Sequence, residues 1–414
     1  MKLTKPKKLK KPDTSQQAIE LELQYGALNY HPLPVVLSVG KGVWVGDLEG
    51  KRYLDFLAGY SALNQGHCHP KIIAALIEQA QKLTLTSRAF HNDLLGIFEK
   101  RLCELFGYER LLPMNTGVEA VETAIKLSRK WGYEEKGVAP GAAKIIVCED
   151  NFHGRTIAAI SASTSRESRD GFGPFLEGII KIPFNDLVAL KFALEDESVV
   201  GFLVEPIQGE AGLLLPERDY LKDASQLCKT AHVLFMADEV QTGLGRTGKL
   251  LACDYEEVRP DILILGKALS GGVLPLSAVL ANEKIMKCIR PGEHGSTFGG
   301  NPLACSVGLA AIDALLDEGM IENSSKLGEV FRRELEGVGP DLVTEVRGMG
   351  LMNAIEVLSW GKASAHDICL KLLEKGLLAK PTRQNVIRLT PPLMISESEL
   401  AQAIEIIRKT FLEI

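Results

Sequence analysis

The sequence predicts an α/β protein with a mostly parallel β-sheet covered by helices on both faces, followed by a smaller α+β domain. Between residues 144 and 281, short apolar runs alternate with helix-length segments. Each run is apolar on both faces, which is typical of buried parallel strands. After about residue 315, helices flank weaker strands. A chain of 414 residues also exceeds the usual size of a single core, which favours two domains.

The chain begins with a Lys-rich segment that has no apolar run behind it, so residues 1–15 are expected to form a solvated tail rather than a secretory signal. Residues 16–30 predict a short helix. Residues 42–56, "GVWVGDLEGKRYLDF", predict a strand, a turn and a second strand.

Five buried strands are predicted in the middle of the chain, at residues 144–149, 199–207, 232–240, 261–268 and 276–281. In the last hundred residues, helices are predicted at 324–338 and 365–377, and strands at 350–357 and 385–392. Ligands of such open sheets bind beyond the carboxyl ends of the strands. Polar residues at those ends are therefore the candidates for a functional site.

The composition excludes several classes of function. A net charge of -6 gives no general attraction to nucleic acid or to an anionic membrane. The sequence has no apolar window of about 18 residues, so no membrane span is expected. The eight cysteines form no C-x-x-C pair, which favours reduced thiols and a cytoplasmic location.

The most informative residue is Lys267, which directly follows the apolar run 262–265 and Gly266. Asp238 and Glu239 end the preceding predicted strand. A lysine and a carboxylate at neighbouring strand ends suit pyridoxal 5'-phosphate, because the lysine forms an imine and the carboxylate keeps the pyridine nitrogen protonated. Taken alone, the lysine could be a snorkelling or ion-paired side chain, and the acids could cap a helix.

A phosphate site is predicted at the helix that begins in "MNTGVEAVETAIKLSRK". Thr116 and Glu119 have the spacing of a capping box, and Gly117 lets an anion approach the free backbone N–H groups. The glycine-rich segment 292–302 carries the hydroxyls of Ser296 and Thr297, which could donate to the same phosphate or belong to an ordinary turn.

Two alternative motifs are weaker. "GLGRTG", at 243–248, fits a dinucleotide-binding pattern, but Asp238, Glu239 and Gln241 separate it from the strand and no long helix follows. A nicotinamide-dependent dehydrogenase is therefore a distant alternative, and a non-catalytic binding protein leaves Lys267 unexplained.

In "NQGHCHP", His67, Cys68 and His69 lack a partner cluster for zinc, so no metal is expected.

Two arginines are candidates for binding a substrate carboxylate. Arg155 lies shortly after one predicted strand, and Arg388 lies in the C-terminal domain. Glu205 and Glu210 follow a third strand. Two arginines that meet in one crevice would suit a dicarboxylate, although either could instead form a surface ion pair.

Blocks throughout the chain resemble the class III aminotransferases of the fold type I pyridoxal-phosphate enzymes, and among them the members that act on ornithine. The blocks are "YGALNYHPLPV", "NQGHCHPKI", "LTLTSRAF", "MNTGVEA", "GFGPF", "VEPIQGEAG", "ADEVQTGLGRTG", "RPDILILGKALSGG", "PGEHGSTFGGNPLA" and "GLLAKPT". The resemblance implies a seven-stranded sheet and a homodimer with shared active sites. It also implies a small domain built from residues 16–60 and 315–414, around a large cofactor-binding domain at 61–314.

The resemblance assigns cofactor roles residue by residue. Lys267 would be the Schiff-base lysine and the proton shuttle, and Asp238 would hold the pyridinium. The other expected contacts are Gln241 with the phenolic oxygen, Phe152 stacked on the ring, and Gly117, Val118, Ser296 and the partner subunit's Thr297 on the phosphate. His153 departs from the family pattern, which has an aromatic residue at this position more often.

The resemblance also implies the substrates. Tyr30 and Arg155 would receive the α-amino and α-carboxylate groups of ornithine, and Tyr60 would shape the pocket. Glu210 would mask Arg388 in the first half-reaction and release it for 2-oxoglutarate in the second. The implied ping-pong reaction gives glutamate 5-semialdehyde and glutamate; acetylornithine and 4-aminobutyrate are the alternative amino donors.

Overall fold

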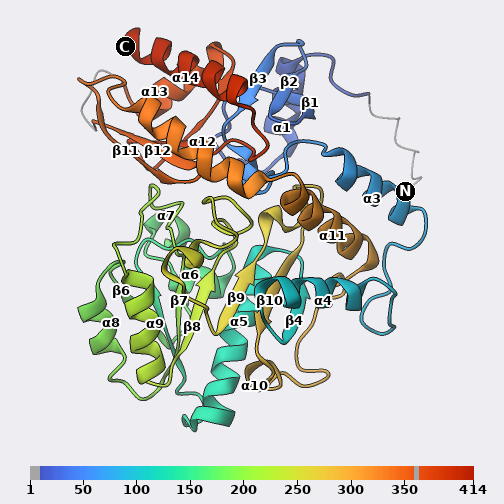
Figure 1. Cartoon of the computed structure of the whole chain (residues 1–414), viewed down its shortest axis with the longest axis vertical. Coiled ribbons are helices and arrows are strands. Elements are labelled where there is room, and N and C mark those ends of the chain that lie inside the picture. Colours follow the sequence, from blue (N-terminus) through green and yellow to red (C-terminus); the bar gives the residue numbers. More distant parts are fainter. Residues whose placement is uncertain (1–9, 359–362) are drawn as a thin grey trace, which may run out of the picture.

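The computed structural model describes residues 10–358 and 363–414, so most of the expected basic tail lies outside the described residues. Its centre is a seven-stranded sheet with the strand order β4-β10-β9-β8-β7-β5-β6 (Figure 1). The strands are β4 (Arg110–Met114), β5 (Lys144–Cys148), β6 (Ile179–Ile182), β7 (Val199–Val204), β8 (Leu234–Asp238), β9 (Ile262–Leu265) and β10 (Ser277–Ala281).

The sheet confirms the predicted mostly parallel arrangement. Strands β6, β5, β7, β8 and β9 pair in parallel, and β10 is antiparallel to both of its neighbours. All five predicted strands are present. The sequence patterns did not locate β4 and β6.

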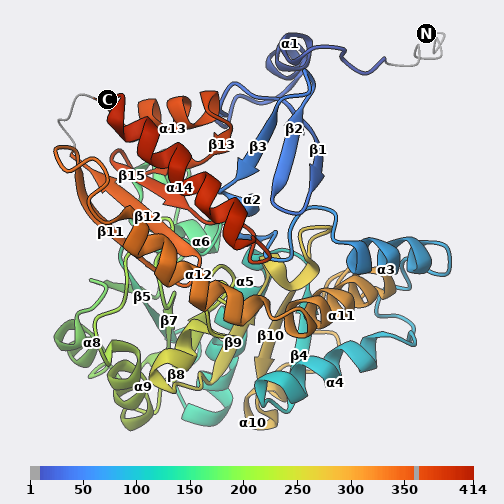
Figure 2. The same ribbon diagram turned by 45° about the horizontal axis from the view of Figure 1, so that its top comes forward.

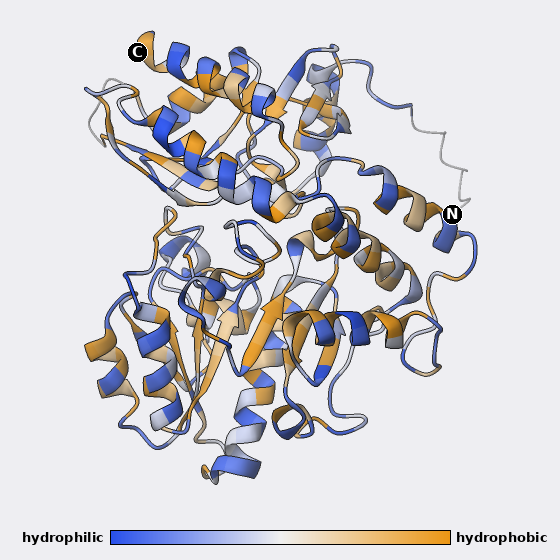
Figure 3. Cartoon of the chain, in the orientation of Figure 1, coloured by the Kyte–Doolittle hydropathy of each residue, from blue (hydrophilic) through white to orange (hydrophobic). Residues whose placement is uncertain are grey.

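Helices cover both faces of this sheet, because the side chains of each strand alternate between two apolar clusters. In β5, Ile145 and Val147 pack into the cluster that contains α5 (Gly117–Trp131). Ile146 and Cys148 pack into the opposite cluster, with α8 (Leu187–Ala193) and α9 (Tyr220–Thr230). The strands of the central sheet accordingly appear mainly hydrophobic, whereas the surface helices show a hydrophilic side (Figure 3).

Further helices and turns surround the sheet. They are α2 (Ala58–Ser61), α3 (Pro70–Ala80), α4 (Leu95–Phe106), α6 (Ile157–Ala162), α7 (Arg166–Arg169), α10 (Glu283–Met286), α11 (Pro302–Asp317), a π-helical turn (Gly132–Lys136) and two 3₁₀ turns (Ala252–Glu256 and Lys267–Ser270).

Two four-stranded sheets contain the remaining strands. One has the order β1-β2-β3-β13 and the other β11-β12-β15-β14. Their strands are β1 (Leu37–Lys41), β2 (Trp44–Asp47), β3 (Arg52–Asp55), β11 (Val343–Met349), β12 (Met352–Val357), β13 (Leu377–Leu378), β14 (Lys380–Thr382) and β15 (Val386–Leu389). The associated helices are α12 (Met320–Leu335), α13 (Ala365–Glu374) and α14 (Glu397–Leu412).

The two ends of the chain meet in the first of these small sheets. β13 pairs in parallel with β3, and Figure 2 shows β1–β3 beside the C-terminal elements. The predicted hairpin is confirmed by the antiparallel pairing of β2 with β3. The helix predicted over 16–30 is too long, because α1 (Ser15–Tyr25) ends where Gly26 turns to an extended backbone.

The segment "GLGRTG" continues from β8 as turns rather than as a helix, so the dinucleotide-binding alternative is wrong. Its Arg246 is fully buried and connects distant parts of the chain. The guanidinium donates to Asn64 Oδ1 and to the carbonyls of Leu351 and Pro391. Burial lowers the pKa of Arg246 to about 9, and the charge of Asp55 opposes this shift.

Within residues 10–358 and 363–414, none of the helices has the length and apolar character needed to cross a bilayer.

We expect Arg246→Met to lower the thermal unfolding midpoint by several degrees. The substitution leaves buried carbonyls without a donor, and each such group costs about 1–3 kcal/mol. Differential scanning calorimetry measures the change, with Arg218→Met as the control because that side chain is 95% exposed. Equal unfolding midpoints for Arg246→Met and the parent protein would contradict the conclusion that Arg246 stabilises the fold by connecting the segments of Asn64, Leu351 and Pro391.

Candidate active site

A cleft of about 870 Å³ lies beyond the carboxyl ends of the sheet strands. Asn151, Phe152 and Arg155 reach it from the segment after β5, Glu210 from the segment after β7, and Arg388 from β15 of the C-terminal sheet. All five side chains expected to bind substrate line this cleft, together with Phe152: Tyr30, Tyr60, Arg155, Glu210 and Arg388. The structure therefore brings together residues that are separated by up to several hundred positions in the sequence.

A second hollow, of about 420 Å³, contains Lys267. It is also lined by Asn115, Thr116 and Gly117, at the start of α5. The candidate nucleophile and the candidate phosphate site thus share one hollow.

Lys267 begins the 3₁₀ turn that follows β9, and its backbone has a φ of 44°, in the left-handed region that is unfavourable for a residue with a side chain. Burial lowers the pKa of Lys267 to about 8, and the Arg388 charge also acts in this direction. Glu210, Asp238 and Glu205 oppose the shift. The neutral amine, which is the form that acts as a nucleophile, is therefore more populated near neutral pH than in an exposed lysine.

Asp238 is the last residue of β8, and its side chain is almost fully buried. Its Oδ2 lies 2.7 Å from Nδ1 of His153, and its Oδ1 accepts the N–H of Val240. Burial opposes a charge on His153, but the hydrogen bond and the charge of Asp238 raise the pKa of His153 above its ordinary value. The histidine that departs from the family pattern is thus a direct partner of the candidate pyridinium-binding carboxylate.

Glu205 follows β7 and is buried below the cleft. Its Oε1 accepts the backbone N–H of Phe152 at 2.8 Å, which fixes the segment that carries the expected stacking ring. Burial raises the pKa of Glu205 to about 7, with a further contribution from the charge of Asp238, while His153 opposes the shift. Its role is to hold the backbone of Phe152.

The start of α5 confirms the predicted capping box. Thr116 accepts the Glu119 N–H, and Glu119 accepts the Thr116 N–H. The next N–H groups of a helix have no intrahelical acceptor, so those of Gly117 and Val118 are available to an anion. A side chain at Gly117 would place its Cβ 2.9 Å from Val240 Cγ1, so glycine is required for this packing.

These features fit pyridoxal phosphate. Besides the lysine, the carboxylate and the helix start, Gln241 has a buried side-chain Oε1 that finds no hydrogen-bond partner among the described residues. The cleft also exposes the Phe152 ring, which is 37% exposed. Ser296 lines neither hollow, and its hydroxyl accepts from Asn115 Nδ2 and Gly299 N, so its contact with the phosphate stays a prediction. Thr297 is exposed away from both hollows, so its contact with a partner's cofactor stays a prediction.

The two arginines of the cleft differ in whether a carboxylate neutralises their positive charge. Arg388 is buried and donates to Glu210 Oε1 at 2.8 Å and to the Gly209 carbonyl at 2.9 Å. Burial alone would raise the pKa of Glu210, but Arg388 lowers it below its usual value. Arg155 instead donates to the hydroxyl of Ser168 at 2.6 Å, and within the described residues it forms no ion pair. One cationic group is therefore masked and the other is available.

Sequence reasoning missed several residues of this site. Ser168 gave no signal, because it is a serine in a polar stretch. Arg383 and Asp150 form a 2.6 Å ion pair between the C-terminal sheet and the segment after β5, and both line the cleft. Lys380 lies over the Tyr60 ring, as does Arg388 at a shorter distance.

The histidine cluster has structural partners. His67 Nε2 lies 2.7 Å from Asp55 Oδ2, and His69 Nε2 lies 3.1 Å from Glu318 Oε2. Across the described part of the chain, no group of three or more metal-ligating side chains is found.

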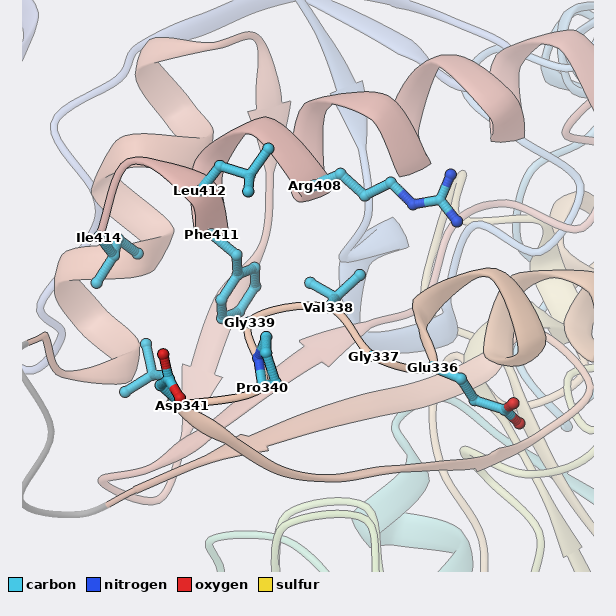
Figure 4. A pocket seen from close by; sticks show the side chains of 11 residues that line it. Glu336, Gly337, Val338, Gly339, Pro340, Asp341, Arg408, Phe411, Leu412 and Ile414 are labelled. Carbon is cyan, nitrogen blue, oxygen red and sulfur yellow. The ribbon is translucent and has the colours of Figure 1, made fainter.

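Another hollow, of about 620 Å³, lies between the loop after α12 and the end of α14 (Figure 4). Its walls are largely apolar, with Val338, Phe411 and Leu412 among them. None of the predicted site residues lines it. The chemistry of the chain is therefore concentrated in the cleft and at Lys267.

The chain is similar to known proteins along nearly its whole length. The family described as Aminotransferase class-III matches residues 25–411. The mitochondrial ornithine aminotransferase of Drosophila melanogaster is 57% identical over 391 residues, which covers 94% of this chain and 90% of the relative.

Two solved structures are also similar. The ornithine aminotransferase of Toxoplasma gondii, crystallised with PLP at partial occupancy in its active site, has a TM-score of 0.95 at 50% identity and covers 97% of this chain and 95% of that chain. The acetylornithine aminotransferase of Elizabethkingia anophelis has a TM-score of 0.89 at 55% identity, covering 97% of this chain and 100% of that chain.

We expect covalent capture of pyridoxal phosphate by the cofactor-free protein to accelerate as pH rises through about 8, because only the neutral amine of Lys267 attacks the aldehyde. Stopped-flow visible absorbance measures the rate. Lys267→Ala should retain its thermal unfolding midpoint but show no covalent capture, and should lose turnover by about a thousandfold or more. Near-normal turnover in this variant would remove Lys267 from the mechanism.

Proposed function

We propose that the protein transfers the δ-amino group of L-ornithine to 2-oxoglutarate. The chain belongs to the class-III aminotransferase family, and the proposal builds on that membership. The products are glutamate 5-semialdehyde and glutamate, formed in two half-reactions on the same site. The observation that carries the proposal is the pair of cleft arginines in opposite states: Arg155 available, and Arg388 neutralised by Glu210.

Pyridoxal phosphate supplies the carbonyl that accepts the amino group and the ring that withdraws electrons from the substrate carbon. Lys267 would bind it and would move the proton at the reacting carbon. Asp238, hydrogen-bonded to His153, would keep a negative charge at the pyridine nitrogen. Gly117 and Val118 would offer their N–H groups to the phosphate, Gln241 would contact the phenolic oxygen, and Phe152 would pack against the ring.

The amino donor is cationic at its reacting end and carries an α-carboxylate at its other end. Arg155 binds that carboxylate, and the exposed hydroxyl of Tyr30 lies at the same cleft for the α-amino group. Because Glu210 neutralises Arg388, the δ-amine meets no unpaired cation near Lys267. Tyr60, whose ring lies 5.3 Å from the Arg388 guanidinium carbon, limits the width of the cleft at this point.

The amino acceptor is a dianion and needs a second cation. Movement of Glu210, whose side chain is 31% exposed, releases Arg388 for one carboxylate of 2-oxoglutarate while Arg155 holds the other. An arginine left buried and unpaired in the other half-reaction would cost about 3–5 kcal/mol. A carboxylate that pairs and releases avoids this cost.

Acetylornithine is the second candidate donor, because the Elizabethkingia anophelis protein of that activity is 55% identical to this chain. It shares the δ-amine and the α-carboxylate with ornithine, so Lys267 and Arg155 serve both donors equally. The two donors differ at the α-nitrogen, which is a cation in ornithine and a neutral, larger amide in acetylornithine. Tyr30 is the cleft residue assigned to that group.

The proposal includes a homodimer. Phe90 and Phe298 are large apolar side chains that are 74% and 55% exposed, in segments joined by the hydrogen bond from Asn92 to the Gly300 carbonyl. Large exposed aromatic side chains of this kind mark a surface that is buried by a protein partner, and in this proposal the partner is a second copy of the chain. Thr297 lies next to this patch, as its assigned role in the partner's site requires.

We further propose that residues 61–314 form the large cofactor-binding domain and that 16–60 and 315–414 form the small one. The shared sheet of β3 and β13 supports this division. A reducing compartment such as the cytoplasm is supported by the eight cysteines, all of which are free thiols.

The amino-donor preference tests the function. We expect the initial rate with 2-oxoglutarate and L-ornithine to exceed the rates with acetylornithine and 4-aminobutyrate at equal concentrations. Release of glutamate 5-semialdehyde, trapped as a coloured adduct, and formation of glutamate are measured together. A higher rate with acetylornithine would reassign the donor, and no transfer from any of the three amines would overturn the proposal.

Glu210→Gln separates the two half-reactions. We expect the rate of the ornithine half-reaction to fall by about a hundredfold or more, because Arg388 keeps an uncompensated charge. The 2-oxoglutarate half-reaction should change much less. Single-turnover absorbance measures both. Glu167→Gln is the matched control, since that carboxylate lines the same cleft without contacting Arg388. If Glu210→Gln slowed both half-reactions equally, the masking of Arg388 by Glu210 would be contradicted.

A further inference from the structure

Arg155 is held in the cleft by groups that carry no charge. Its Nη1 donates to Ser168 Oγ at 2.6 Å, and its guanidinium carbon lies 5.3 Å from the centre of the Phe152 ring. The hydroxyl and the ring fix the guanidinium from two directions. Neither of them neutralises it, so its full charge remains available to a ligand.

The carboxylates of neighbouring segments are engaged elsewhere. Asp150 pairs with Arg383, and Glu122 accepts the hydroxyl of Thr156, the residue next to Arg155. Glu167 lines the cleft, but among the described residues it makes no ion pair with Arg155. The surroundings thus leave this arginine oriented and unneutralised, in contrast to Arg388.

Ser168 is itself held firmly, although α7 is only four residues long. The next residue, Arg169, donates to the carbonyls of Ile160, Ser161 and Ser163, and its guanidinium lies 3.9 Å from the Phe175 ring centre. These bonds attach α7 to the end of α6. Ser168 is consequently buried, with only its hydroxyl directed to Arg155.

We propose that Ser168 is a positioning residue that orients Arg155 toward the α-carboxylate of the amino donor without consuming its charge. The inference rests on the proposed function, because it takes Arg155 as the carboxylate-binding group. A neutral acceptor suits this role, because an aspartate or glutamate at position 168 would orient the guanidinium equally well but would compete with the substrate carboxylate. The serine therefore contributes to the selection of donors that carry a carboxylate.

The test compares three donors with the loaded enzyme: L-ornithine, δ-aminovalerate, which keeps the carboxylate but lacks the α-amine, and 1,4-diaminobutane, which lacks the carboxylate. We expect Ser168→Ala to raise the KM for the first two donors by about tenfold, the value of one hydrogen bond to a charged group. Their kcat and the KM for the diamine should stay within about twofold. Ser168→Thr, which keeps the hydroxyl, should restore the parent KM.

Control variants keep the inference falsifiable. Ser165→Ala removes a hydroxyl from the same segment that makes no capping bond, and it should leave all three KM values unchanged. In an Arg155→Met background, Ser168→Ala should have no additional effect on the KM for δ-aminovalerate. The thermal unfolding midpoint and the visible cofactor spectrum of Ser168→Ala should match those of the parent protein.

Two results would overturn the role of Ser168: an unchanged KM for ornithine, or an equal rise of KM for all three donors, which indicates a general structural effect. Both results are distinct from failure of the proposed function. In that case the parent enzyme itself shows no transfer from ornithine.

Discussion

The hydrogen-bonded pairing of β8 with β9 fixes the geometry on which the site depends. In this parallel register Asp238 lies opposite Ile264, and Lys267 follows three residues later. A carboxylate and an amine are thereby held at neighbouring strand ends by backbone bonds rather than by flexible side chains. The strands are buried on both faces, so a shift of register would move apolar side chains out of two cores at once.

The distribution of charge explains how one cleft serves two unlike substrates. The buried acids lie toward Lys267, where Asp238 is stabilised by His153 and Glu205 has a raised pKa. Arg388 is buried and paired with Glu210, whereas Arg155 has no carboxylate partner among the described residues. In the proposed reaction the charges near Lys267 thus stay fixed, and the charge that changes its partner is that of Glu210.

Much of this arrangement could be predicted from the sequence. Apolar runs located five of the seven central strands, and the residues that follow them include Asp238 and Lys267. β4 was missed because its apolar run is short. Only Leu111 and Leu112 lie between Arg110 and Pro113. The capping box at Thr116 was predictable because its partners are three residues apart. The predicted first helix was longer than α1. None of the residues of α1 is buried, so no tertiary packing stabilises further helical turns after Tyr25.

Contacts between distant segments could not be predicted from local patterns. Ser168 meets Arg155 only because Arg169 attaches α7 to α6, and His153 meets Asp238 across 85 positions. A serine or a histidine in a polar stretch carries no periodic signal of such a meeting. Family resemblance placed the substrate residues, whereas the neutral support of Arg155 required the three-dimensional arrangement.

The buried Arg246 has one more consequence. Its four hydrogen bonds extend from a loop after β8 to Asn64 and to carbonyls at Leu351 and Pro391, and the last of these follows the strand that carries Arg388. Separating the two walls of the cleft would break these hydrogen bonds and leave the Leu351 and Pro391 carbonyls without their donor. Arg246 therefore opposes a hinge motion between the walls, which leaves the response to ligands of different charge to side chains such as Glu210.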